Sequence, residues 1–177
     1  MKALLIIDMQ KGCFNPYSSR YDTFGVISRI NGLSEKFRWK QYPVIFIQHD
    51  GSREGELFPQ TDEWRLLPEL TQEDTDIYIG KTANDSFYKS GLEEKLSSLG
   101  IEELFITGSA TDFCVDSTVK SAITKDYKVT VISDGHTTGD RKKIPAKLLI
   151  EHYNWIWSDM SPTIAKIQVV EADAVRL

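Results

Sequence analysis

Three residues of different chemical types could together activate a thiol. Asp8 directly follows the continuous apolar run Ala3–Ile7, Lys81 comes shortly after Ile77–Ile79, and Cys114 follows another strand-like segment. A thiol is only slightly ionised at neutral pH; a helix N-terminus and an ammonium group lower its pKa, and a carboxylate can accept its proton. If the three side chains share one crevice, they supply a nucleophile, a base and an orienting cation.

Each of these residues also has an ordinary structural interpretation. A cysteine just inside a helix is usually a small buried apolar residue. An aspartate at the end of a strand often caps a helix or a turn. Lys81, beside Gly80, has the setting of a solvated loop lysine. A catalytic role is favoured only if the three residues lie close together in the fold. The positions of the predicted strands and helices that carry them therefore decide between the two interpretations.

Short apolar runs alternate with helix-like segments along the chain. We expect strands at residues 3–7, 44–47, 77–79, 103–107, 129–132 and 167–170, and helices at 26–37, 92–99, 115–123 and 144–153. This alternation is typical of βαβ units with a parallel sheet that is covered on both faces. We therefore predict an α/β fold, a three-layer Rossmann-like sandwich with a mainly parallel sheet of about six strands and helices on both faces.

The predicted sheet determines where a ligand should bind. In such folds ligands bind beyond the carboxyl ends of the strands. The positions expected at this edge are Asp8, Gln48–His49, Gly80–Lys81, Gly108–Cys114 and Asp134. The segment from His49 to Asp76 contains no clear element, and a loop of that length in a small domain is usually functional.

Length and composition exclude several classes of protein. The 177 residues fit a single domain, residues 1–177. A net charge of −5 disfavours binding to nucleic acid or to an anionic membrane surface. No apolar run approaches the roughly 20 residues of a membrane span. The N-terminus also lacks a signal-peptide core, so we expect a cytoplasmic protein. The two cysteines, Cys13 and Cys114, cannot make a disulfide framework or a four-thiolate zinc site.

Four segments resemble those of the isochorismatase-like cysteine hydrolases. They are Leu5–Gln10, Gly80–Lys81 with Asp85–Phe87, Gly108–Thr118 and Asp134–Thr138. The resemblance runs from Lys2 to about Val170, in the family's order. It is specific for the family but not for a substrate, because the family includes nicotinamidases, carbamoylsarcosine-type amidases, other amide hydrolases and isochorismatases.

The resemblance implies a role for each matching residue. Cys114 would be the nucleophile, Asp8 the general base, and Lys81 the cation that orients Asp8 and stabilises the thiolate. A cis peptide would join Ser109 to Ala110, and the N–H groups of Ala110 and Cys114 would form an oxyanion hole. The reaction would be attack on a carbonyl, loss of ammonia or an amine, and hydrolysis of the thioester, with no cofactor.

Two departures narrow the reaction that the resemblance implies. Isochorismatases proper generally lack the cysteine, so Cys114 favours a hydrolase of a small amide or carbamoyl compound, acting on C–N bonds other than peptide bonds. Nicotinamidases usually carry a metal site built on Asp-x-His with a further His, whereas here Gln48 precedes His49 and no histidine lies between His49 and His136. We therefore predict no metal. The alternatives are a nicotinamidase without that metal site and a non-catalytic binding protein of the same fold, although no member of the triad is lost.

Candidate substrate-binding residues come from the loops near the triad. Many relatives have a pocket-wall phenylalanine where Cys13 stands, so Phe14 could take that role from one position along. Cys13 would then either face the pocket or pack, and packing is favoured. Gln48 and His49 follow the second strand, although His49 could equally bond a neighbouring loop. Trp64 in the long loop could clamp a substrate or cover the core.

Two further expectations concern packing and assembly. Ser86 and Phe87 should brace Lys81 rather than touch substrate. The late aromatics Tyr153, Trp155 and Trp157 could form an exposed cluster, and exposed aromatics often mark interfaces. A buried helix cap is the alternative. Because members of the family are commonly oligomers, we expect a homodimer or homotetramer that acts on a small-molecule amide, with no nucleic acid or membrane partner.

Overall fold

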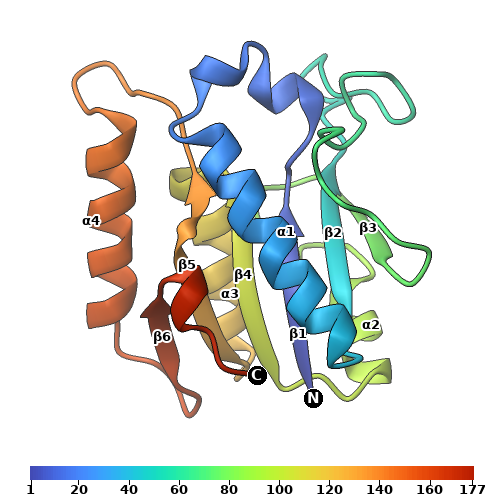
Figure 1. Ribbon diagram of the computed structural model, residues 1–177, viewed down its shortest axis with the longest axis vertical. Coiled ribbons are helices and arrows are strands. Elements are labelled where there is room, and N and C mark those ends of the chain that lie inside the picture. Colours follow the sequence, from blue (N-terminus) through green and yellow to red (C-terminus); the bar gives the residue numbers. More distant parts are fainter.

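A parallel sheet of six strands forms the middle layer of the molecule (Figure 1). The computed structural model describes residues 1–177. The strands are β1 (Lys2–Ile7), β2 (Val44–His49), β3 (Ile77–Lys81), β4 (Glu103–Ser109), β5 (Lys128–Thr137) and β6 (Ile167–Val170). Their spatial order is β3-β2-β1-β4-β5-β6, and every neighbouring pair is parallel.

Helices cover both faces of the sheet, as predicted. The α-helices are α1 (Thr23–Trp39), α2 (Leu92–Ser98), α3 (Asp116–Thr124) and α4 (Ala146–Asp159). Figure 1 shows α1 crossing one face, with α3 behind the sheet and α4 beside β5 and β6. The short helices are Lys11–Phe14, Tyr17–Ser19, the π-helix Thr111–Val115 and Ala172–Ala174. The predicted three-layer α/β fold is confirmed.

The central position of β1 in the sheet explains why its sequence is continuously apolar rather than alternating. Side chains of a strand point alternately to its two faces. Leu4 and Ile6 pack in the core cluster that contains α1, whereas Leu5 and Ile7 pack in the cluster that contains α2, α3 and α4. Both faces of β1 are therefore buried, and a polar residue placed at its end meets little water.

Strand β5 is longer than its sequence pattern indicates. The apolar run ends at Ile132, but the strand continues to Thr137. After a register shift, His136 and Thr137 pair with Gly108 and Ser109 at the end of β4. The side chains of this extension are mostly polar, so a search for apolar runs does not predict it. Hydrogen bonds to β4 hold it in the sheet.

The sheet order places a crevice beside the end of β1. From β1 the chain proceeds outward to β2 and β3, and it later returns to β4 on the other side of β1. Such a reversal separates the loops that follow the two central strands, and ligands bind there in open α/β sheets. Asp8 follows β1 and Ala110 follows β4, so both residues lie at this point.

None of the helices is long and apolar enough to cross a membrane.

Candidate active site

The side chain of Lys81 joins the three predicted catalytic residues. Lys81 is the last residue of β3, and its side chain is fully buried and reaches past β2. Its Nζ lies 2.7 Å from Asp8 Oδ2 and 3.2 Å from Cys114 Sγ, and it donates to the carbonyl of Ala83 at 2.9 Å. A fourth contact, at 3.4 Å, goes to His49 Nδ1. A buried ammonium with this set of partners is held in one place.

Asp8 has one free oxygen. Its Oδ2 pairs with Lys81, while Oδ1 is buried and has no hydrogen-bond partner. The backbone of Asp8 lies in the left-handed region, with φ of 49°, and its N–H donates to the carbonyl of Ile47. Buried polar atoms are almost always satisfied, and exceptions gather at functional sites. The free Oδ1 is the acceptor that a general base requires.

Cys114 lies in the π-helix that precedes α3. The Val115 N–H bonds to the carbonyl of Ala110, five residues earlier, and single π-turns of this kind often occur at functional sites. The sulfur is partly exposed; it accepts from Lys81 and donates a long hydrogen bond, at 3.6 Å, to Asn84 Oδ1. The π-turn therefore brings the thiol beside the Lys81 ammonium at the rim of the crevice.

The peptide between Ser109 and Ala110 is cis. The preceding Gly108 has φ of +119°, and a Cβ at this position would lie 2.2 Å from the backbone oxygen of Ile7. Only glycine fits between β4 and β1 at this point. The N–H of Ala110 donates to no backbone or side-chain acceptor of the chain. It therefore remains free to donate to a ligand in the cavity that Ala110 lines.

The resting charges differ from the sequence expectation of an activated thiolate. Burial and the negative charge of Asp8 raise the pKa of Cys114, and the opposing effect of Lys81 is smaller. Burial alone would lower the pKa of Lys81, but Asp8 and Cys114 raise it above its ordinary value. Lys81 therefore rests as an ammonium beside a neutral thiol.

Burial and the Lys81 ammonium lower the pKa of His49. A neutral imidazole can accept a hydrogen bond from Lys81 through Nδ1. His49 is thus a further polar support of the lysine.

A cavity of about 400 Å³ opens onto this triad. Its lining is Asp8, Cys13, Arg20, His49, Glu54, Glu56, Leu57, Thr82, Ala83, Asn84, Ser109, Ala110, Phe113 and Cys114. Catalytic nucleophile, base and both oxyanion-hole residues predicted from the sequence border one space. Its size suits a small ligand.

Cys13 and His49 line the cavity, but three other predicted substrate-binding residues do not. Phe14 is fully buried in the core cluster under α1, because the short helix Lys11–Phe14 turns its ring inward and leaves Cys13 facing the cavity. Burial and Asp8 raise the pKa of Cys13 to about 12. Phe14 therefore does not form the wall that the sequence suggested, whereas Cys13 both packs against the core and faces the cavity.

Gln48 and Trp64 face a different hollow, bordered also by Lys11 and Tyr78. The Gln48 amide donates to the carbonyl of Trp64 at 3.2 Å, so it ties the long loop to β2. Gln10 makes a similar link, donating to the carbonyls of His49 and Trp64. Gln48 and Trp64, both predicted to bind substrate, thus lie outside the cavity that Asp8 and Cys114 border, and the amides of Gln48 and Gln10 hold the loop through the Trp64 carbonyl.

The predicted aromatic cluster on α4 is only partly exposed. Trp157 is fully buried, and its Nε1 donates to Asp116 at 3.0 Å, whereas Trp155 is 60% exposed. Residues two apart on a helix point to nearly opposite sides, so Trp157 packs on the sheet and Trp155 does not. The expected homodimer or homotetramer stays a prediction.

Ser86 and Phe87 do not contact the lysine ammonium. Ser86 bonds to Thr118 at 2.8 Å, and Phe87 packs in the core. Ala83 and His49 brace Lys81 instead.

Three of the cavity residues that were not predicted from the sequence are Arg20, Asn84 and Phe113. Arg20 and Asn84 lie in irregular segments, and Phe113 is one position before the nucleophile. Asn84 stands three residues after Lys81, a spacing that could have drawn attention to it. Phe113 is held by Arg141, whose guanidinium lies 5.0 Å from its ring centre.

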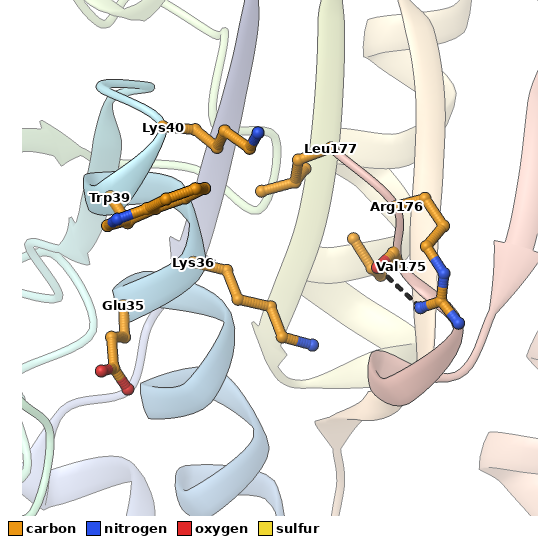
Figure 2. Close-up of a pocket in the computed structure, with 7 residues that line it drawn as sticks. All are labelled: Glu35, Lys36, Trp39, Lys40, Val175, Arg176 and Leu177. Carbon is orange, nitrogen blue, oxygen red and sulfur yellow. Dashed lines mark hydrogen bonds between the residues drawn. The ribbon is translucent and has the colours of Figure 1, made fainter.

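Another hollow, of about 420 Å³, lies between the end of α1 and the C-terminal segment. Figure 2 shows Lys36 and Trp39 of α1, and Lys40 directly after it, opposite Val175 and Leu177. It contains no thiol, hydroxyl or imidazole that could act as a nucleophile or base. The chemistry is therefore assigned to the cavity at the strand ends.

No group of three or more histidine, cysteine, aspartate or glutamate side chains is arranged to hold a metal ion.

The sequence matches the model of the isochorismatase domain over residues 2–155. The chain belongs to the isochorismatase family. A crystal structure of an isochorismatase family protein superposes with a TM-score of 0.87 at 30% identity, and the match covers 96% of this chain and 98% of that one. The predicted family is confirmed.

Two of the curated proteins that the chain resembles have named activities, and both are hydrolases. Streptothricin hydrolase of Streptomyces noursei is 28% identical over 82% of this chain and 52% of its own length. The ureidoacrylate amidohydrolase RutB of Caulobacter vibrioides is 31% identical over 57% of this chain and 46% of its own. The matches thus span about half the length of these two relatives. They agree with the predicted enzyme class, a hydrolase of C–N bonds.

Proposed function

We propose that this protein is a cysteine-dependent hydrolase that cleaves the C–N bond of a small amide or carbamoyl compound through a thioester. One observation carries the proposal: the Lys81 ammonium contacts both Asp8 Oδ2 and Cys114 Sγ, while Asp8 Oδ1 is buried without a partner. A nucleophile, a free base and a cation that orients both are the parts of covalent acyl transfer.

The first half of the reaction forms the thioester. Asp8 Oδ1 takes the proton of the Cys114 thiol while Sγ attacks the carbonyl carbon of the substrate. The N–H groups of Ala110 and Cys114 donate to the oxygen, which becomes negatively charged. As the C–N bond breaks, the carboxylic acid of Asp8 gives its proton to the leaving nitrogen, so that ammonia or an amine departs.

The second half returns the enzyme to its starting state. Asp8, again a carboxylate, removes a proton from a water molecule that attacks the thioester carbonyl. The C–S bond breaks, the acid leaves, and the proton on Asp8 returns to Cys114. Lys81 remains charged throughout, so it stabilises the carboxylate before each transfer and the sulfur during it. The raised pKa of Cys114 fits this cycle, because the thiol ionises only as it attacks.

The amidohydrolase relative supports a C–N bond as the target. The polar and charged lining of the cavity favours a small polar substrate over an extended apolar one.

Ammonia release from a panel of small primary amides and ureido compounds tests the proposal. We expect turnover by the wild type and none by Cys114→Ala. The matched control is Ser121→Ala, a polar-to-alanine change on α3 away from the cavity, which should keep full activity. Hydrolysis that survives in Cys114→Ala would contradict the covalent mechanism, and saturable binding of an amide with no turnover would favour a binding protein.

A further inference from the structure

Arg20 places a positive charge in the catalytic cavity with no counter-ion from the protein. The residue follows the short helix Tyr17–Ser19, and its partly buried side chain lines the cavity together with Asp8 and Cys114. It forms no ion pair and no side-chain hydrogen bond, and its Nε is buried with no partner. Arg20 therefore has N–H donors without acceptors in the cavity where a substrate must bind.

The surroundings hold this guanidinium in position without neutralising it. Its central carbon lies 5.9 Å from the centre of the Phe14 ring, a cation–π contact. On another side, a Cβ placed on Gly139 would be 3.1 Å from Nη1, so the turn at Gly139 packs closely against the group. These contacts fix Arg20 but satisfy none of its strong donors.

The neighbouring Arg141 shows what a structural arginine looks like in the same region. Asp112 receives two hydrogen bonds from it, from Nε at 2.8 Å and from Nη2 at 3.1 Å. Arg141 is thus paired with a carboxylate of the protein, and it also braces Phe113. Arg20 offers the same fork of Nε and Nη donors, but the protein provides no carboxylate to fill it.

The other charges of the cavity do not fill this role. Asp8 is paired with Lys81, while Glu54 and Glu56 are exposed at the rim, and neither lies within 4 Å of Arg20. Burying an arginine donor without an acceptor is costly, and a planar fork of N–H donors matches a carboxylate in a bidentate manner. The protein therefore supplies no carboxylate for the donors of Arg20.

We infer that Arg20 is a specificity residue that binds a carboxylate of the substrate, so that the preferred substrates are small amides or ureido compounds that also carry an acid group. This inference rests on the proposed function for the identity of the scissile bond. It adds that an amido acid should be cleaved much faster than the matching neutral amide. The rim glutamates favour a single negative charge over two, since a second one would be repelled.

Two thiol reagents test the carboxylate site without a known substrate. Iodoacetate and iodoacetamide both alkylate cysteine and differ in one charged group. The measured quantity is the alkylation rate of Cys114 by iodoacetate divided by its rate with iodoacetamide. We expect this ratio to fall about ten- to hundredfold in Arg20→Met, the range for a lost hydrogen bond to a charged group. It should recover in part in Arg20→Lys. Arg53→Met removes an equal charge from the loop 50–56 outside the cavity lining and should leave the ratio unchanged.

Hydrolysis of paired substrates gives a second measurement. The pairs are ω-amido acids and neutral amides in which a methyl group replaces the carboxylate. Arg20→Met should raise KM for the acids by a much larger factor than it changes kcat/KM for the neutral amides. An alkylation ratio that is equal in wild type and Arg20→Met overturns the carboxylate site. If that ratio changes but no amide is cleaved, the proposed function fails and the anion site stands.

Discussion

Replacing Asp8 by asparagine distinguishes the effect of the Asp8 carboxylate on the Cys114 thiol from the effect of the Lys81 ammonium. Lys81 lies 3.2 Å from the sulfur and 2.7 Å from Asp8, so the carboxylate offsets much of its effect. Asparagine keeps the size of the side chain and removes the negative charge. We therefore expect the pKa of Cys114 to fall in Asp8→Asn, although the variant loses the base that turnover requires.

The geometry sets the size of this shift. Two unit charges 3.2 Å apart attract by about 5 kcal/mol at an effective dielectric constant of about 20. Since one pKa unit corresponds to about 1.4 kcal/mol, the unopposed ammonium could lower the pKa by at most about four units. Water in the open cavity screens the pair, and we expect a fall of about two units.

Alkylation by iodoacetamide at a series of pH values measures the shift. Mass spectrometry of the peptides separates Cys114 from Cys13, which shares the cavity. In Asp8→Asn the midpoint for Cys114 should move down by about two units, while amide hydrolysis falls on the order of a thousandfold. Asp62→Asn, which changes an exposed carboxylate, should alter neither quantity. A midpoint that stays or rises in Asp8→Asn, or hydrolysis that persists, would refute the assignment of Asp8 as base.

Three further substitutions test other parts of the account. Lys81→Met should raise the pKa of Cys114 and slow its alkylation at neutral pH at least tenfold; unchanged labelling would remove the lysine from the mechanism. Burial lowers the pKa of His136 from 6.5 to about 4, so the unfolded chain binds a proton that the folded protein does not. Stability should therefore fall by about 2 kcal/mol from pH 7 to pH 5 in urea unfolding, and less in His136→Gln; equal losses would contradict this origin. Gly108→Ala should cost about 3 kcal/mol or more, because its Cβ meets the backbone of β1, whereas Gly32→Ala, in an open position of α1, should be neutral or stabilising; similar midpoints for the two variants would show that the contact relaxes.

The catalytic positions could be located from sequence because they follow buried strands. A continuous apolar run such as Ala3–Ile7 fixes both the strand and its end, and parallel strands bring their carboxyl ends to one edge. Asp8 and Cys114 therefore had predictable places. The long side chain of Lys81 had only to reach across one strand.

The loops could not be placed in the same way, because their conformations depend on distant hydrogen bonds. Gln10 ties the carbonyls of His49 and Trp64 together, and no local pattern records that link. The short helix Lys11–Phe14 likewise turns the Phe14 ring into the core and leaves Cys13 at the cavity, and the apolar pattern does not record that turn. Arg20 was missed for the same reason, since its importance lies in partners that it does not have.

The thioester itself is the most direct test of the account. Wild-type protein mixed with p-nitrophenyl acetate and quenched in acid should carry one acetyl group, and peptide mass spectrometry should place it on Cys114. The label should disappear on longer incubation as water completes the cycle, and Cys114→Ala should acquire none. An acetyl group found only on lysines or on Cys13, with Cys114 unmodified at every time, would contradict the claim that Cys114 is the nucleophile.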